Sequence, residues 1–311
     1  MARLVLALAV LAVSTSAPLI RYADPAPPLT VAAFRVCLAG LFLSIAAPRA
    51  WLLFVGLPRR EKIYIVTSGL LLGAHFGTWI TSLYLTSTAA SVALVATQPI
   101  FAALFASALG DRITRQQAIG IAVAGLGCAV LAAGDITRDD AGMQAIAGDA
   151  LALLGAATAA GYLVVGRRMR VSMPLTPYLA VVNTVAGAGL LVVALCAQSR
   201  FIGFPGHVYL ACVLVAVVPS LIGHSLLNWS VRRTPTHLVS LAVLGEPIGA
   251  SLLTWHFFAE VPPTHSGVGG AVILAGIFVA FIRRPSGEKS VRTNVSEKAS
   301  TSSEKGGTDP T

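Results

Sequence analysis

The sequence predicts an all-α polytopic membrane protein with ten transmembrane helices, arranged as two inverted five-helix repeats. Three observations predict this fold class. Of the 311 residues, 56% are hydrophobic and only 11% are charged, whereas soluble domains carry about 25% charged residues. The apolar residues gather in stretches long enough to span a bilayer, and the second half of the chain repeats the first. This composition excludes a soluble globular protein.

A spanning helix needs about 20 apolar residues, because each backbone N–H and C=O in the hydrocarbon must be bonded within the segment. Ten stretches meet this requirement: 4–20, 29–47, 63–85, 89–109, 117–133, 147–166, 176–197, 208–230, 237–258 and 266–282. The first also resembles a secretory signal peptide, but the repeat requires it as a helix, so we expect an uncleaved anchor. Polar residues dominate after Arg283, and we expect 285–311 to be a disordered cytoplasmic tail.

The distribution of Lys and Arg predicts the orientation. With a cytoplasmic amino terminus, 18 of the 22 basic residues fall in inside segments, and only Arg21, Arg138 and Arg200 fall outside. This asymmetry predicts that both termini are cytoplasmic in a multi-pass protein of the cell inner membrane. It also accounts for the formal charge of +9 without nucleic acid as a partner.

The two halves align at a nearly constant offset. The matched positions are Gln98 with Glu246, Pro99 with Pro247, Asp111 with Glu260, Gly120 with Gly269, His75 with His224 and Arg35 with Asn183. We place the first repeat at residues 1–140 and the second at 141–284. Because each copy holds five spans, the second is inverted, which is typical of secondary transporters whose substrate site lies near the midplane. Chance similarity of Ala- and Leu-rich helices is the alternative.

The chain also resembles a known family in three stretches. They are STSAPLIRYADPAPPLTVAAFR, TSTAASVALVATQPIFAALF with GDRIT, and GHSLLNWSVRRTPTHLVSLAVLGEPIGAS. They are similar to the EamA-like branch of the drug/metabolite transporter superfamily, whose members are ten-helix carriers. The resemblance covers about residues 4–282 and implies a metabolite carrier, commonly an exporter. Asp111 departs from the glutamate usual in that family, but it keeps the acidic character.

Glu246 is the leading candidate for a functional residue because it lies near the centre of the ninth span. A carboxylate there costs several kcal/mol unless it is paired, hydrated or protonated. It would bind a substrate ammonium or take up a proton, or else serve structurally as a neutral acid. Pro247 and Pro99 predict helix breaks at matching depths, which point to a binding site. Many membrane helices also hold prolines without such a role.

Arg35 lies in the outer third of the second span. It is either a counter-ion for a substrate carboxylate or a side chain that extends to the outer interface. Asn183, at the matching place, is expected to hydrogen-bond between helices.

Two histidines each share a helix face with a second candidate residue. His75 and Trp79 are one turn apart on the third span, and His224 and Asn228 are one turn apart on the eighth. The histidines would relay protons, or they are hydrogen-bonded core residues.

Other residues receive structural interpretations. Ser14, Ser16, Ser91 and Thr97 are either cavity hydroxyls or helix contacts. Tyr84, Trp51, Trp229 and Trp255 are expected in the interfacial belts. Gly69, Gly73 and Gly77 predict close approach of another helix, within the bundle or across a homodimer interface. Thr114 and Gln117 predict a capping box, and Asp149 predicts a cap of the sixth span.

The sequence therefore predicts a secondary transporter and not an enzyme. It contains no P-loop, HExxH motif, nucleophile elbow or metal-ligand spacing among its cysteines, and we expect neither cofactor nor metal. The predicted partners are the bilayer, a small organic solute that is amino-acid-like or cationic and amphipathic, and protons exchanged for it during export. An uncoupled facilitator, an intramembrane enzyme and a non-transporting scaffold are the alternatives.

Overall fold

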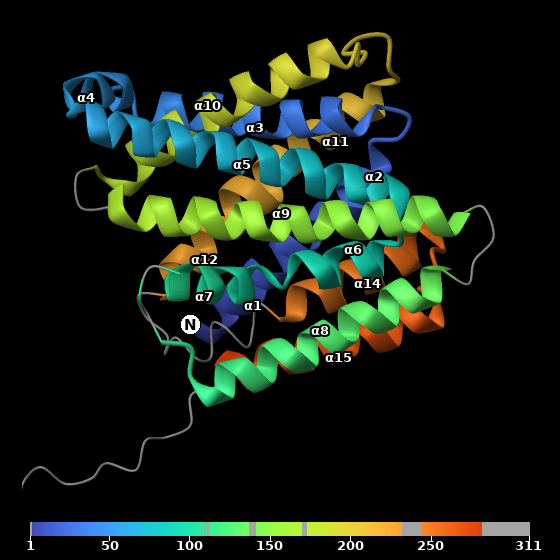
Figure 1. Ribbon diagram of the computed structural model, residues 1–311. Coiled ribbons are helices and arrows are strands. Elements are labelled where there is room, and N and C mark those ends of the chain that lie inside the picture. The colour runs from blue at the N-terminus through green and yellow to red at the C-terminus, as the bar shows by residue number, and fades with distance from the viewer. Residues whose placement is uncertain are drawn as a thin grey trace, which may run out of the picture. The chain divides into compact units, whose positions relative to one another are not determined.

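The computed structural model describes residues 2–108, 110, 112–136, 141–169, 173–231 and 244–281, and every regular element in them is a helix (Figure 1). Nine of the helical segments are long and apolar enough to cross a membrane. They coincide with the predicted spans other than the ninth, of which only residues 244–258 are described. The all-helical membrane fold is confirmed, and the proposed tail lies outside the described residues.

Helices of the first half alternate with short connections. They are α1 (Ala2–Ser14), α2 (Ser16–Tyr22), α3 (Pro28–Ala46), α4 (Ala50–Gly56), α5 (Arg59–Leu85), α6 (Thr88–Val95), α7 (Gln98–Ala108) and α8 (Arg115–Ile136). Those of the second half are α9 (Ala141–Met169), α10 (Leu175–Cys196), α11 (Gly206–Val215), the π-helix η1 (Ala216–Gly223), α12 (His224–Val231), α14 (Gly245–Phe258) and α15 (Thr264–Phe281).

The predicted helix break in the first repeat is confirmed. The fourth span is divided into α6 and α7 by a turn at Ala96 and Thr97. Pro99 is the second residue of α7, where a backbone N–H would have no acceptor within the helix, so the lack of one in proline costs no hydrogen bond. In the second repeat α14 begins at Gly245 and Pro247 lies in its first turn, while residues 232–243 are outside the described part.

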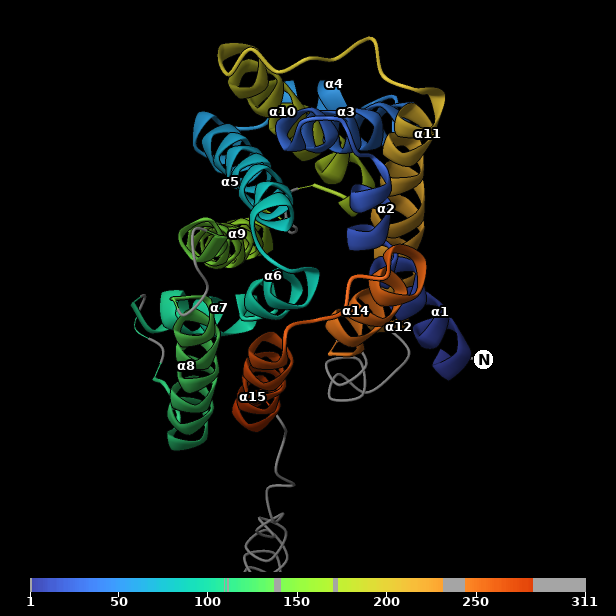
Figure 2. The ribbon, with the colours of Figure 1, turned by 90° about the vertical axis from the view of Figure 1, so that its right-hand side faces the viewer.

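The helices α8 and α15 run side by side and approach each other through glycines (Figures 1 and 2). A Cβ on Gly120 would lie 2.5 Å from the Gly276 oxygen, and one on Gly127 would lie 2.7 Å from the Gly269 oxygen. The alignment pairs Gly120 with Gly269 and Gly127 with Gly276, so each contact is the repeat equivalent of the other. This reciprocity is what a twofold axis between inverted repeats requires.

The contact between α3 and α10 is reciprocal in the same way. A Cβ on Gly40 would lie 3.0 Å from the Thr184 nitrogen, and one on Gly187 would lie 2.8 Å from the Cys37 sulfur. The two contacts are equivalent if Gly40 of the first repeat corresponds to Gly187 of the second, and Cys37 to Thr184. Both pairs are 147 residues apart in the chain. Our alignment of Arg35 with Asn183 is therefore one residue out of register, and Val182 is the counterpart.

The glycine stripe of α5 packs within the bundle. Cβ atoms on Gly69, Gly73 and Gly77 would meet atoms of α10 at 2.7 to 3.0 Å. Of the two predicted uses, the structure assigns the stripe to this intrachain contact.

One of the two predicted helix caps is confirmed. Thr114 Oγ1 accepts from the Gln117 backbone N–H at 3.2 Å, and Gln117 Oε1 accepts from the Thr114 N–H at 2.9 Å. Asp149 was expected to cap the sixth span, but this was wrong because α9 begins at Ala141, so Asp149 lies two turns inside the helix.

Candidate functional site

Arg35 is the most deeply buried charged side chain of the candidate site. Its side chain sits in the middle of α3, and the residue is only 2% exposed. Nη1 donates to Ser16 Oγ at 2.7 Å, and Nε donates to Ser220 Oγ at 3.0 Å. Arg35 therefore does not extend to the interface, and the snorkelling alternative is wrong.

Both serines come from places where a helix departs from α geometry. Ser16 begins α2, directly after the interruption at Thr15 that separates it from α1. Ser220 lies in η1, next to Pro219, and donates to the Val215 carbonyl oxygen at 3.0 Å. π-helical turns inside α-helices are frequent at functional sites. Ser220 was not predicted from the sequence, although Pro219 in the middle of the eighth span is a signal for it.

Aromatic rings cover the other side of the guanidinium. Its carbon lies 4.3 Å from the centre of the Phe76 ring and 5.5 Å from that of Trp79. The ring of His75 stacks on Trp79 with 5.9 Å between centroids and 8° between planes, which confirms that the two share a face. His75 Nδ1 donates to the Gly155 carbonyl oxygen at 2.9 Å, which leaves Nε2 of the neutral ring as an acceptor.

Glu246 and both candidate histidines lie within electrostatic reach of Arg35. Glu246 is in the first turn of α14, where the helix dipole favours a negative charge. Within the described residues no direct ion pair joins it to Arg35. His224 begins α12, directly after η1, and is exposed. The Arg35 guanidinium of the first repeat and the Glu246 carboxylate of the second therefore lie near each other without forming a direct ion pair.

The remaining candidates are less closely tied to this cluster. Gln98 begins α7 and is half-buried, and Pro99 is exposed while Pro247 is buried. Asn183 donates to the Leu179 carbonyl oxygen of its own helix at 2.8 Å, not between helices as expected. The Asn228 side chain lies outside the described part of the structure.

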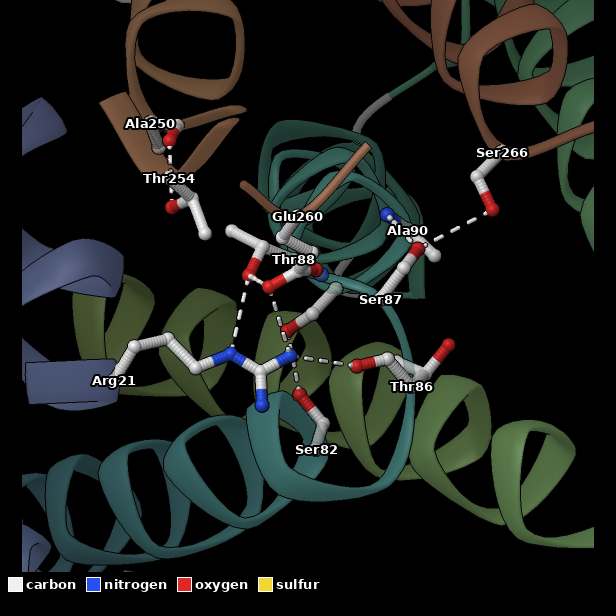
Figure 3. A network of polar contacts seen from close by, with 11 residues as sticks. Arg21, Ser82, Thr86, Ser87, Thr88, Ala90, Ala250, Thr254, Glu260 and Ser266 are labelled. Carbon is white, nitrogen blue, oxygen red and sulfur yellow. Dashed lines mark hydrogen bonds and ion pairs between the residues drawn. The ribbon is translucent and has the colours of Figure 1, made fainter. Parts of the chain in front are cut away.

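A second polar network joins the repeats at one end of the bundle (Figure 3). Arg21 Nη2 lies 3.3 Å from Glu260 Oε2 and donates to the Thr86 carbonyl oxygen at 3.2 Å. Arg21 Nε donates to Thr88 Oγ1 at 3.3 Å. Glu260 accepts from the Thr88 N–H at 2.6 Å and from its hydroxyl at 3.0 Å. From the sequence, Arg21 was predicted only to be a basic residue on the outside, and Glu260 only to be the counterpart of Asp111 in the repeat. Their contact was not predicted, because the sequence does not show that these two distant segments meet.

A third polar group lies where α8, α9 and α15 meet. His265 Nε2 is 2.9 Å from Asp135 Oδ1, and the buried Asp149 lies close to Asp135 and Thr86. Within the described residues, no group of three His, Cys, Asp or Glu side chains is arranged to hold a metal ion.

Comparison with known proteins decides the family. The family model described as EamA-like transporter family matches residues 1–133 and again residues 146–282. The chain belongs to the EamA-like transporter family. Two matches in succession also agree with the repeat seen in the alignment and in the reciprocal glycine contacts.

Among solved structures, this EamA-like transporter is similar to one titled "Crystal structure of protein", with a TM-score of 0.60 and 21% identity. The match covers 90% of this chain and 96% of the other chain, and it supports the fold alone. No curated protein matches the chain. The family implies a membrane transporter of small molecules in a lipid bilayer.

Proposed function

We propose that this EamA-like transporter is a secondary carrier for a small organic solute that bears both an ammonium and a carboxylate group. The observation that carries the proposal is the arrangement around Arg35. Its cation and the Glu246 carboxylate interact electrostatically, but they are not in direct contact within the described residues. A zwitterion fits this arrangement, with its carboxylate on Arg35 and its ammonium on Glu246.

The energetics support a functional reason for Arg35. A charged arginine inside a membrane span is costly, and it is retained where it faces the bundle interior and has partners there. Bonds to two serines and a cation–π contact with Phe76 offset part of this cost. Trp79 Nε1 is buried and has no hydrogen-bond partner within the described residues, so it is a second donor for a bound carboxylate.

The coupling ion is proposed to be the proton. A carboxylate in a desolvated site binds either a proton or a cation, so one side chain exchanges the two without further machinery. Glu246 would be protonated from outside, release the proton inwards and then attract the ammonium group of the solute. In this proposal both termini are cytoplasmic, as the basic loops predict, and transport is export across the inner membrane.

The test is counterflow in proteoliposomes with wild type, Glu246→Gln and the matched control Glu61→Gln. Glu61 is an acidic residue in the first turn of α5, outside the Arg35 cluster. A thermal-shift screen over amino acids, sugars and cationic drugs first identifies the labelled solute. We expect wild type and the control to respond to a proton gradient, and Glu246→Gln to lose this response.

Two results would contradict the proposal. A pH dependence that is unchanged in Glu246→Gln would remove this residue from coupling. Counterflow by wild type that ignores the proton gradient would leave an uncoupled facilitator.

A further inference from the structure

A cavity of about 430 Å³ opens beside the Arg21 and Glu260 network. Its lining residues are Arg21, Asp24, Tyr84, Phe258 and Glu260. They come from the ends of α2, α5 and α14 and from the adjoining loops, so both repeats contribute. The volume lies within the range of small-molecule sites. None of the residues proposed for the central site lines this cavity.

The hydrogen bonds of the lining residues leave one positive and one negative group for a ligand. Within the described residues, the bonds of Arg21 use Nε and Nη2, and both oxygens of Glu260 are bonded to Thr88 (Figure 3). No such bond uses Nη1 of Arg21 or the carboxylate of the exposed Asp24. A guanidinium edge and a carboxylate therefore border the same space.

Two aromatic rings provide an apolar wall. Tyr84 is half-buried, its hydroxyl donates to the Ala26 carbonyl oxygen at 3.1 Å, and it interacts electrostatically with both Asp24 and Arg21. Phe258, the last residue of α14, is 38% exposed. The hydroxyl bond fixes the Tyr84 ring, so the wall is formed before a ligand binds. Tyr84 lies at the end of the third span, and its place in the interfacial belt stays a prediction.

We infer that this cavity is a second binding site for a zwitterionic solute with an apolar body, at the entrance to the transport pathway. The ammonium group binds Asp24, the carboxylate binds Nη1 of Arg21, and the body contacts Tyr84 and Phe258. The inference rests on the proposed function, because it assigns the same class of solute to both sites. It also agrees with the central cluster, where Arg35 and Glu246 accompany the rings of Phe76 and Trp79.

The entrance site also acts on the contact between the repeats. A carboxylate on Nη1 of Arg21 brings a second negative charge close to Glu260, which is bound at Nη2, and the repulsion between the two carboxylates offsets part of the attraction of Glu260 to the guanidinium. Binding of the solute therefore loosens the cross-repeat contact at this end.

The experiment measures equilibrium binding of L-leucine to the purified full chain by titration calorimetry. Isopentylamine, which lacks the carboxylate, and isocaproate, which lacks the amine, are the comparison probes. The variants are Asp24→Asn for the entrance site, Glu246→Gln for the central site and Glu61→Gln as a control. Asp24 is exposed, so Asp24→Asn is expected to fold, and its melting temperature checks this.

We expect two classes of L-leucine site in wild type and in the control, and weaker binding of both comparison probes. Asp24→Asn is expected to weaken one class by about tenfold or more, the loss of a charge-assisted bond, and to leave the other class unchanged. Glu246→Gln is expected to do the reverse.

The outcomes separate this inference from the proposed function. If Asp24→Asn binds L-leucine as wild type does, the entrance site is refuted. The result for Glu246→Gln then tests the central site separately. If only the class affected by Asp24→Asn exists, the central site is refuted instead. If L-leucine does not bind wild type, or isopentylamine binds as tightly, the zwitterionic class assigned here is wrong.

Discussion

Replacing Glu260 by Gln removes a negative charge from the contact that joins the repeats at one end of the bundle. The Arg21 and Glu260 side chains are 26% and 25% exposed, so solvent screens the pair only in part. The ion pair contributes about 0.5–1 kcal/mol to the free energy of unfolding at this exposure. The negative charge of Glu260 strengthens its hydrogen bonds from Thr88, which contributes about 1 kcal/mol more. Glutamine keeps one carbonyl oxygen for the Thr88 N–H. We therefore expect a loss of about 2 kcal/mol in total, of which about 1 kcal/mol is coupling to Arg21.

A double-mutant cycle measures this coupling. The proteins are wild type, Arg21→Gln, Glu260→Gln and the double variant, and the readout is thermal unfolding in detergent. A second readout is the labelling rate of Ser266→Cys by an impermeant maleimide, because Ser266 is buried and contacts Ser87 next to this network; the protein lacking this cysteine is the control. A shift of about 2 kcal/mol changes the ratio of open to closed forms about 30-fold, so labelling of Glu260→Gln is expected to be markedly faster.

Two results would refute this reasoning. The first is additivity of the two single changes within about 0.3 kcal/mol, which would mean that the pair is not coupled. The second is an unchanged labelling rate in Glu260→Gln, which would mean that the network does not hold this end closed.

Three further predictions concern the helices. Gly127→Ala would place a Cβ 2.7 Å from the Gly269 oxygen and should cost about 1–3 kcal/mol in thermal unfolding. Gly125→Ala, on the same helix with nothing within 4 Å, should be neutral or stabilising, and equal effects of the two would contradict the crossing. Thr114→Ala removes half of the capping box and should cost about 1 kcal/mol, unlike a Leu126→Ala control at an exposed position inside α8; no difference between them would contradict the cap. Pro219→Ala restores a backbone N–H and favours regular α geometry, so Ser220 should turn away from Arg35. Counterflow should fall without loss of melting temperature, and unchanged counterflow would mean that the π-helix does not position the site.

Much of the fold followed from the sequence because its causes are local. Length and apolar composition predict the spans, and the matched prolines predict the broken fourth span. The matched residues, such as Gly120 with Gly269, predict a repeat, and the odd number of spans in each copy predicts its inversion. The Thr114 and Gln117 capping box is likewise read directly, because both partners lie within one turn.

The failures share one physical reason, which is dependence on tertiary proximity. Asp149 resembled a cap because sequence places helix starts only roughly, and α9 begins earlier at Ala141. The partners of Arg35 come from other helices, and the contact of Arg21 with Glu260 joins the end of α2 to the loop after α14, far apart in the chain. The roles of Glu246 and the histidines stay predictions, and the repeat boundaries at residues 140 and 284 are likewise untested.

The π-helix at Pro219 has no counterpart at the matching place in α5 of the first repeat, a helix that the structure describes in full. His75 aligns with His224, which places Leu70 opposite Pro219, and α5 is a continuous α-helix there. Two identical halves would make the inward-open and outward-open forms equal in energy, because exchanging the halves would interconvert them. For a carrier of the proposed kind, a proline in one half alone is one difference that makes these two forms unequal in energy.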